Sequence, residues 1–167
     1  MKRLVDYVLP ALALFACVWV SRVFVAADVV ALVMPLASLL AIALVGVVGG
    51  LLPALPLGVG YGLMRARPVV SAALVVASTA SVLELVFASV SVPWWAFVSW
   101  FVLPLECITL VVFFPAAAWL GSRLLSSRPP AVRRRAGLIL FAVLTLCAIA
   151  WPWLYSCVRF GACGLVA

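Results

Sequence analysis

Residues 29–64 read VVALVMPLASLLAIALVGVVGGLLPALPLGVGYGLM and contain no charged side chain. At about 1.5 Å per residue, a continuous helix of this length is far longer than the roughly 30 Å hydrocarbon core of a bilayer. The stretch is nevertheless too short for two ordinary spans. It therefore predicts one transmembrane helix over about residues 29–48, followed by a segment that is not an ordinary span.

Glycine and proline mark the predicted break. Gly49 and Gly50 are adjacent, and five further breakers follow them: Pro53, Pro56, Gly58, Gly60 and Gly62. Non-helical backbone at membrane depth is tolerated only where it is buried in protein or lines a wet cavity. We therefore expect residues 49–64 to be irregular or half-helical, either re-entrant or lying at the interface. The G-x-x-x-G spacings at 46–50 and 58–62 also permit close helix packing.

The rest of the chain has the same apolar character. Of the 167 residues, 69% are hydrophobic and 9% are charged, whereas soluble domains have about 45–50% and about 25%. Four further spans are predicted, over about residues 4–26, 68–90, 95–120 and 136–155. The first resembles a signal peptide, but it is long for one and contains Arg22, which favours a retained helix. We expect one all-α transmembrane domain, residues 1–167, with about five transmembrane helices.

The distribution of positive charge predicts the orientation. With the N-terminus inside, nine of the eleven Lys and Arg residues fall on the cytoplasmic side, and only Arg22 and Arg159 fall outside. Five of the nine lie in a basic linker over residues 121–135. We therefore expect a multi-pass protein of the plasma (inner) membrane with its C-terminus outside. The net charge of +7 is assigned to loops beside anionic lipid headgroups, and no nucleic-acid partner is expected.

The residue inventory excludes several chemistries. The sequence has no His, Asn or Gln, and Lys2 is its one lysine. A Ser-His-Asp triad and histidine-based metal or haem sites are therefore impossible within this chain. Asp6 and Asp28 lie near opposite ends of the first predicted hairpin, so they do not form an aspartyl-protease pair. We expect no catalytic site, no metal and no cofactor.

Glu106 is the most informative polar residue, because it lies near the middle of the fourth predicted span. Ser99 and Thr109 share its helical face at i−7 and i+3. A charged carboxylate in a membrane costs several kcal/mol unless it is paired. Two interpretations stay open: an ion-coupling or substrate-cation site, or a protonated acid bonded to a backbone carbonyl.

Glu84 lies on a face of small residues in the third predicted span. That face contains Ala73, Ala77, Ala80, Ser81, Glu84 and Ala88. Small residues let helices approach closely, so Glu84 should point into the protein. We expect a buried Arg22–Glu84 ion pair. The alternatives are that Arg22 reaches the outer headgroups or pairs there with Asp28.

Two further features lie outside the predicted spans. Cys157 and Cys163 fall in the predicted external tail, on the oxidising side, and are expected to form a disulfide. Arg133, Arg134 and Arg135 of the basic linker are expected to contact lipid headgroups or an acidic partner.

These features favour a small non-catalytic subunit or accessory component of a membrane assembly. Its partners would be lipid and other membrane subunits, or further copies of itself, which would help to bury Glu84 and Glu106. The alternative is an oligomeric transporter or channel in which Glu106 binds a proton or cation and Glu84 assists. A lipid-modifying or redox enzyme is the weakest hypothesis, because the usual acid, base and metal residues are missing.

Overall fold

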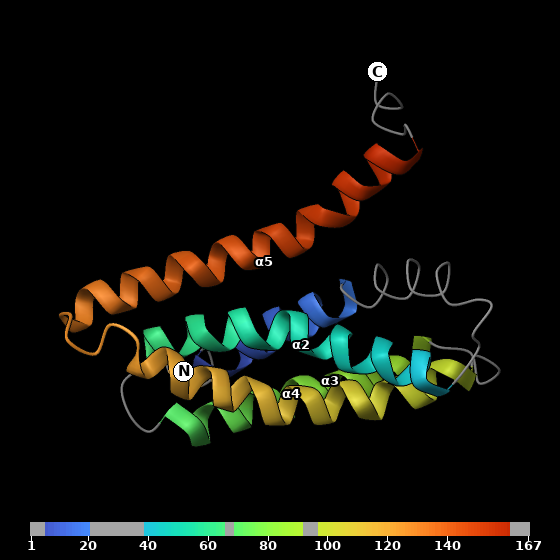
Figure 1. Cartoon of the computed structure of the whole chain (residues 1–167), viewed down its shortest axis with the longest axis horizontal. Coiled ribbons are helices and arrows are strands. Elements are labelled where there is room, and N and C mark those ends of the chain that lie inside the picture. The colour runs from blue at the N-terminus through green and yellow to red at the C-terminus, as the bar shows by residue number, and fades with distance from the viewer. Residues whose placement is uncertain (1–5, 21–38, 66–68, 92–96, 161–167) are drawn as a thin grey trace.

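The computed structural model describes residues 6–20, 39–65, 69–91 and 97–160, and every regular element within these ranges is a helix. A short apolar helix, Asp6–Val20, comes first. Four longer helices follow, namely α2 (Leu39–Met64), α3 (Val69–Ser91), α4 (Phe97–Arg123) and α5 (Pro130–Phe160) (Figure 1). The expectation of an all-helical chain is confirmed for these ranges.

Three of the helices are long and apolar enough to cross a membrane. Their candidate spans are Ala43–Met64, Val69–Val90 and Val102–Arg123. Helices α3 and α4 closely match the third and fourth predicted spans, and α5 contains the fifth, residues 136–155. The protein is therefore a helical membrane protein.

Helix α2 corrects the prediction of a break after residue 48. Residues 49–64, expected to be irregular or half-helical, continue the helix to Met64 with Pro53 and Pro56 inside it. Proline removes one helical donor, but membrane helices tolerate this because neighbouring groups satisfy the freed carbonyls. The glycines mark a helix contact instead of a break, since positions 46, 50, 58 and 62 are spaced by four or eight residues and face α4.

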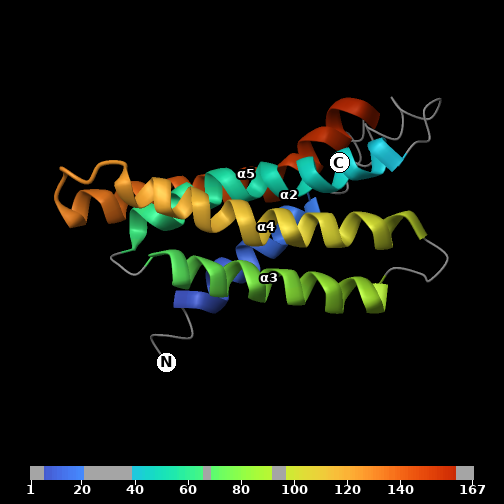
Figure 2. The same ribbon diagram turned by 60° about the horizontal axis from the view of Figure 1, so that its bottom comes forward.

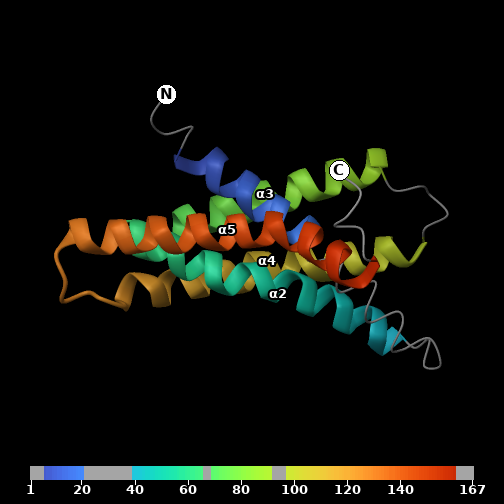
Figure 3. The same cartoon turned by 90° about the horizontal axis from the view of Figure 1, so that it is seen from above.

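Helices α3, α4, α2 and α5 lie side by side in that order, and the contact between α2 and α4 is the most extensive (Figure 2). The Asp6–Val20 helix crosses α3 at an angle (Figure 3). Successive helices run in opposite directions, so the end of α2 and the start of α5 meet at one end of the bundle. We call this the basic end, because six arginines lie there: Arg65, Arg123, Arg128, Arg133, Arg134 and Arg135.

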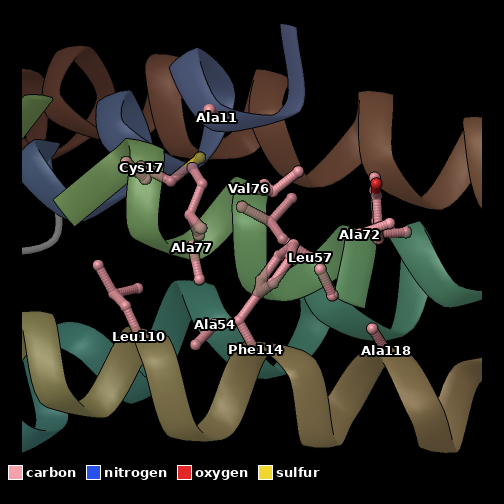
Figure 4. Close-up of a cluster of buried hydrophobic side chains, with 14 of the residues drawn as sticks. Ala11, Cys17, Ala54, Leu57, Ala72, Val76, Ala77, Leu110, Phe114 and Ala118 are labelled. Atoms are coloured by element: carbon pink, nitrogen blue, oxygen red, sulfur yellow. The ribbon is translucent and has the colours of Figure 1, made fainter. Parts of the chain in front are cut away.

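One hydrophobic core joins the Asp6–Val20 helix to α2, α3 and α4 (Figure 4). Its large members include Leu14, Leu57 and Phe114, of which each is at most 1% exposed. Many of the others are alanines, including Ala73 and Ala77 of α3. Small side chains let the helix backbones approach, which is a principal source of packing between helices in lipid.

The contact between α2 and α4 depends on glycine. A Cβ atom at Gly58 would lie 2.7 Å from the Ala117 Cβ and 2.8 Å from the Phe114 carbonyl oxygen. We call this contact the glycine seam; its α2 members are Gly46, Gly49, Gly50, Gly58 and Gly62. Gly121 of α4 meets the Val59 carbonyl in the same way. Backbone therefore packs directly on backbone along the seam.

A short turn connects α4 to α5 at the basic end. The Leu124 N–H donates to the Leu120 carbonyl at 3.0 Å, and Leu125 has a φ of 56°. This left-handed conformation commonly ends a helix. Pro130 then begins α5 at the first helical position, where its missing N–H is not needed.

Candidate functional site: two buried carboxyl groups

Glu106 lies on the face of α4 that packs against α2, and it is 0% exposed. Its carboxyl group occupies the space beside Gly49, where an added Cβ would lie 2.8 Å from the Glu106 Oε1 atom. A side chain at position 49 would therefore displace the carboxyl group. Gly49 is part of this site because it has no side chain.

Thr109 lies one turn beyond Glu106 on the same face and is 4% exposed. Its hydroxyl donates to the Leu105 carbonyl at 2.6 Å, within α4. The Thr109 Cβ would lie 2.9 Å from a Cβ at Gly50, so Thr109 also packs into the glycine seam. The threonine oxygen can still accept a hydrogen bond or contact a cation.

Glu84 is equally buried, on the small-residue face of α3. Each residue predicted on that face is at most 7% exposed: Ala73, Ala77, Ala80, Ser81, Glu84 and Ala88. The expectation that this face packs on protein and turns Glu84 inward is confirmed. Helix periodicity was sufficient for this prediction, because every third or fourth residue is small.

The register of α3 against α4 brings the two carboxyl groups to one depth. The Cys107 thiol donates a weak hydrogen bond to the Ser81 carbonyl oxygen at 3.9 Å. Since the helices are antiparallel, Glu84 is level with residue 104. Glu106 is two residues further, or about 3 Å along the axis at 1.5 Å per residue. The bundle therefore contains two fully buried carboxyl groups at nearly the same depth.

Aromatic rings cover the next turn of α3. Phe87 stacks edge-on against Trp19, with 4.9 Å between ring centroids, and against Phe15, with 5.7 Å. Both partners belong to the Asp6–Val20 helix. This helix therefore packs beside the turn of α3 that follows Glu84.

Several predicted site residues cannot be placed in this arrangement. Arg22 and Cys163 lie outside the described residues, as does Asp28, so the Arg22–Glu84 pair and the disulfide remain predictions. Ser99 lies in the first turn of α4 and Cys157 in the last turns of α5, but their side chains are outside the described set.

The sequence did not predict two contacts of the carboxyl site. Gly49 contacts Glu106, and the Cys107 thiol contacts the Ser81 carbonyl, which sets the register of α3 against α4. Gly49 lies three residues after Gly46, on the same side of α2, and this helical spacing was the signal for it. No such signal exists for Ser81 and Cys107, because their contact depends on how α3 and α4 align.

The site contains carboxyl oxygens that can bind a proton or a cation, and the described residues form no larger group of metal-ligating side chains. Within residues 6–20, 39–65, 69–91 and 97–160, no group of three or more His, Cys, Asp or Glu side chains gathers around one point. Each carboxyl group lies in the apolar interior, where its ionised form is costly unless a proton or a cation neutralises it. Such a site is suited to holding a proton or a single cation.

Comparison with protein families, with curated proteins and with solved structures found nothing that matches this chain. The functional conclusions below therefore depend on the buried carboxyl groups, the glycine seam and the basic end.

Proposed function

We propose that the protein is a membrane transporter or channel that binds a proton or a cation at Glu106, with Glu84 as the auxiliary group. The observation that carries this proposal is the complete burial of the Glu106 carboxyl against the backbone of Gly49. Glu84 lies at nearly the same depth in the same bundle. We place the protein in the plasma (inner) membrane with the basic end at the cytoplasm, in line with the positive-inside rule.

The energetics of the membrane support this assignment. An ionised side chain inside the bilayer costs up to about 2.5–3.5 kcal/mol on insertion scales, so acidic residues there are rare and usually functional. A bound proton or cation removes this charge, and its release restores it. A site that alternates between these states can couple the movement of an ion to the movement of a helix.

Thr109 adds a second oxygen on the face of α4 that carries Glu106. It lies one turn beyond Glu106 and is 4% exposed. Its hydroxyl donates to the Leu105 carbonyl, and its oxygen can still contact a cation. We propose that the Thr109 oxygen takes part in binding the ion at Glu106.

The second candidate is a non-catalytic subunit of a larger membrane assembly. It is favoured by α5, which packs mainly on α2 and exposes a row of large apolar side chains: Leu138, Ile139, Val143 and Leu146. A partner helix could cover them, as lipid could. One argument for a subunit is lost, however, because a single chain already buries Glu84 and Glu106.

Flux measurements on the purified full chain test the proposal. The protein is reconstituted into liposomes that contain a dye selective for protons, Na⁺ or K⁺, one ion per preparation, and the flux of that ion is followed under an imposed gradient. We expect flux from the unmodified protein and a fall to the level of protein-free vesicles in Glu106→Gln. Gly60→Ala, which changes the opposite side of α2, should keep the flux.

Two outcomes would overturn the proposal. One is the absence of any flux from the unmodified protein, and the other is equal flux from Glu106→Gln. Mild extraction of the tagged chain from its native membrane then distinguishes the second candidate, which requires a stoichiometric membrane partner in the purified complex.

A further inference from the structure

A separate cavity of about 750 Å³ lies at the basic end, far from the two glutamates along the helices. It opens between the start of the Asp6–Val20 helix, the end of α2 and the start of α5. Its polar lining consists of Asp6, Tyr7, Tyr61, Arg65, Arg133 and Arg134. The remaining lining residues are apolar.

The charges in this cavity do not balance. The positive charge of Arg65 is paired with Asp6, because its Nη2 lies 3.9 Å from the Asp6 Oδ2. Its Nη1 donates to the Tyr7 hydroxyl at 3.4 Å. Its guanidinium also lies 4.5 Å from the centre of the Tyr7 ring. Asp6 is the one carboxylate among the described residues that line the cavity. Arg133 and Arg134 therefore face the cavity without a balancing negative charge.

Two buried polar atoms in the lining have no hydrogen-bond partner among the described residues. One is the hydroxyl of Tyr61, a residue only 2% exposed, and the other is the Nε of Arg133. Buried polar groups are nearly always hydrogen-bonded, so such groups point to a ligand. Both atoms carry a proton to donate. The ligand they fit must therefore present acceptor oxygens.

The start of α5 strengthens the attraction for a negative charge. Its first turn contains no acidic residue, and Arg133, Arg134 and Arg135 follow at once. The N-terminus of a helix already carries a partial positive charge, and the arginines there add to it. A bound anion would offset both the partial positive charge of the helix N-terminus and the positive charge of the arginines.

We infer that this cavity binds the phosphate group of an anionic phospholipid, held by Arg133, Arg134 and the Tyr61 hydroxyl. Lipid is favoured over a free phosphate by the position of the cavity. It lies at Met64, the last residue of the Ala43–Met64 span, where headgroups meet the hydrocarbon. Leu138 and Phe141 supply an apolar wall suited to the glycerol and upper acyl chains. This inference does not depend on the proposed ion transport.

Native mass spectrometry of the detergent-purified full chain tests the site. Phosphatidylglycerol and phosphatidylcholine are titrated in parallel, and the bound fractions are compared. We expect preferential binding of phosphatidylglycerol, weakened at least about tenfold in the double variant Arg133→Gln/Arg134→Gln, because hydrogen bonds to charged groups are strong.

The matched control is the double variant Arg123→Gln/Arg128→Gln. It removes the same charge from the same basic end, but neither residue lines the cavity. We expect this control to bind phosphatidylglycerol as the unmodified protein does. Equal losses in the two double variants would reveal general surface electrostatics and overturn the site.

Tyr61→Phe tests the cavity without changing its charge, and it still applies if the double variant does not fold. It removes one buried hydroxyl that lacks a partner, so the lipid-free protein should be as thermally stable as the unmodified protein, or more stable. Phosphatidylglycerol binding should weaken several-fold. Unchanged binding in Tyr61→Phe would refute the assignment of this hydroxyl to the phosphate.

Competition with inorganic phosphate distinguishes the two sources of the ligand. We expect millimolar inorganic phosphate to leave bound phosphatidylglycerol in place, because it cannot use the apolar wall. Displacement of the lipid under these conditions would overturn the lipid assignment in favour of a free phosphate.

Discussion

The glycine seam allows one stability prediction to be worked out from atom positions. Gly58→Ala places a methyl group 2.7 Å from the Ala117 Cβ and 2.8 Å from the Phe114 carbonyl oxygen, whereas ordinary contacts begin at 3.4 Å. Neither neighbour can rotate away, because one is a backbone atom and the other is a Cβ atom. Helix α4 must therefore move away from α2 by several tenths of an ångström.

Two opposing effects set the magnitude. Replacing glycine by alanine inside a helix gains about 1 kcal/mol of helix propensity, and overpacking a rigid contact costs about 1–3 kcal/mol. The net effect of Gly58→Ala is a loss of up to about 2 kcal/mol in the free energy of unfolding. Gly60→Ala meets its nearest atom, the Phe141 amide nitrogen, at 3.5 Å, so it should keep the propensity gain. The two variants should differ by about 1–3 kcal/mol.

The assay is unfolding of the purified protein by increasing SDS in detergent micelles, followed by far-UV circular dichroism. Gly58→Ala should unfold at a lower SDS fraction than the unmodified protein, and Gly60→Ala at an equal or higher one. Both variants have the same composition and lie on the same helix. Identical midpoints would refute the conclusion that α2 and α4 pack backbone to backbone.

Two further predictions use the same preparations. Gly49→Ala places a methyl group 2.8 Å from the Glu106 Oε1, so ion flux in liposomes should fall because the carboxyl is displaced; flux equal to that of Gly60→Ala would contradict this. Phe114→Ala should lower the free energy of unfolding by about 3–5 kcal/mol, because Phe114 is 0% exposed. Phe113→Ala, at 40% exposed, should lower it less in the same SDS titration, and equal losses would contradict the assigned burial.

Helical periodicity accounts for what could be predicted from the sequence. The small residues of α3 recur every three or four positions, so one face holds them all and Glu84 with them. Thr109 shares a face with Glu106 for the same reason. Both predictions need only the geometry of a single helix, and burial in the structure agrees with them.

The prediction that helix α2 breaks after residue 48 is wrong, because glycine and proline do not end a helix at membrane depth as they do in water. Glycine and proline weaken a helix in water, but in a membrane the backbone must still form its hydrogen bonds, and a helix achieves this best. Positions 46, 50, 54, 58 and 62 are all Gly or Ala. This regular spacing was the better indicator, since it is typical of a helix that packs closely on another.

The basic-end cavity could not be predicted, because its parts are distant in the sequence. Tyr7, Tyr61 and Arg133 come from three different helices, and their meeting depends on the order in which those helices pack. The same holds for the burial of both glutamates within one chain. We expected partner chains to help bury the two glutamates. In the structure, the close packing of α2 on α4 buries Glu106, and the small-residue face of α3 buries Glu84.

The glycine seam also has a consequence for biosynthesis. Helix α2 makes its largest contact with α4, not with α3, which follows it in the chain. At about 5–20 residues per second, the ribosome needs roughly 3–12 s to travel from the end of α2 to the end of α4. During that interval α2, with its two prolines and its bare glycine backbone, must be sheltered by lipid or by the insertion machinery. Slowing translation between residues 65 and 123 should therefore increase the yield of misassembled chains more than slowing it after residue 130.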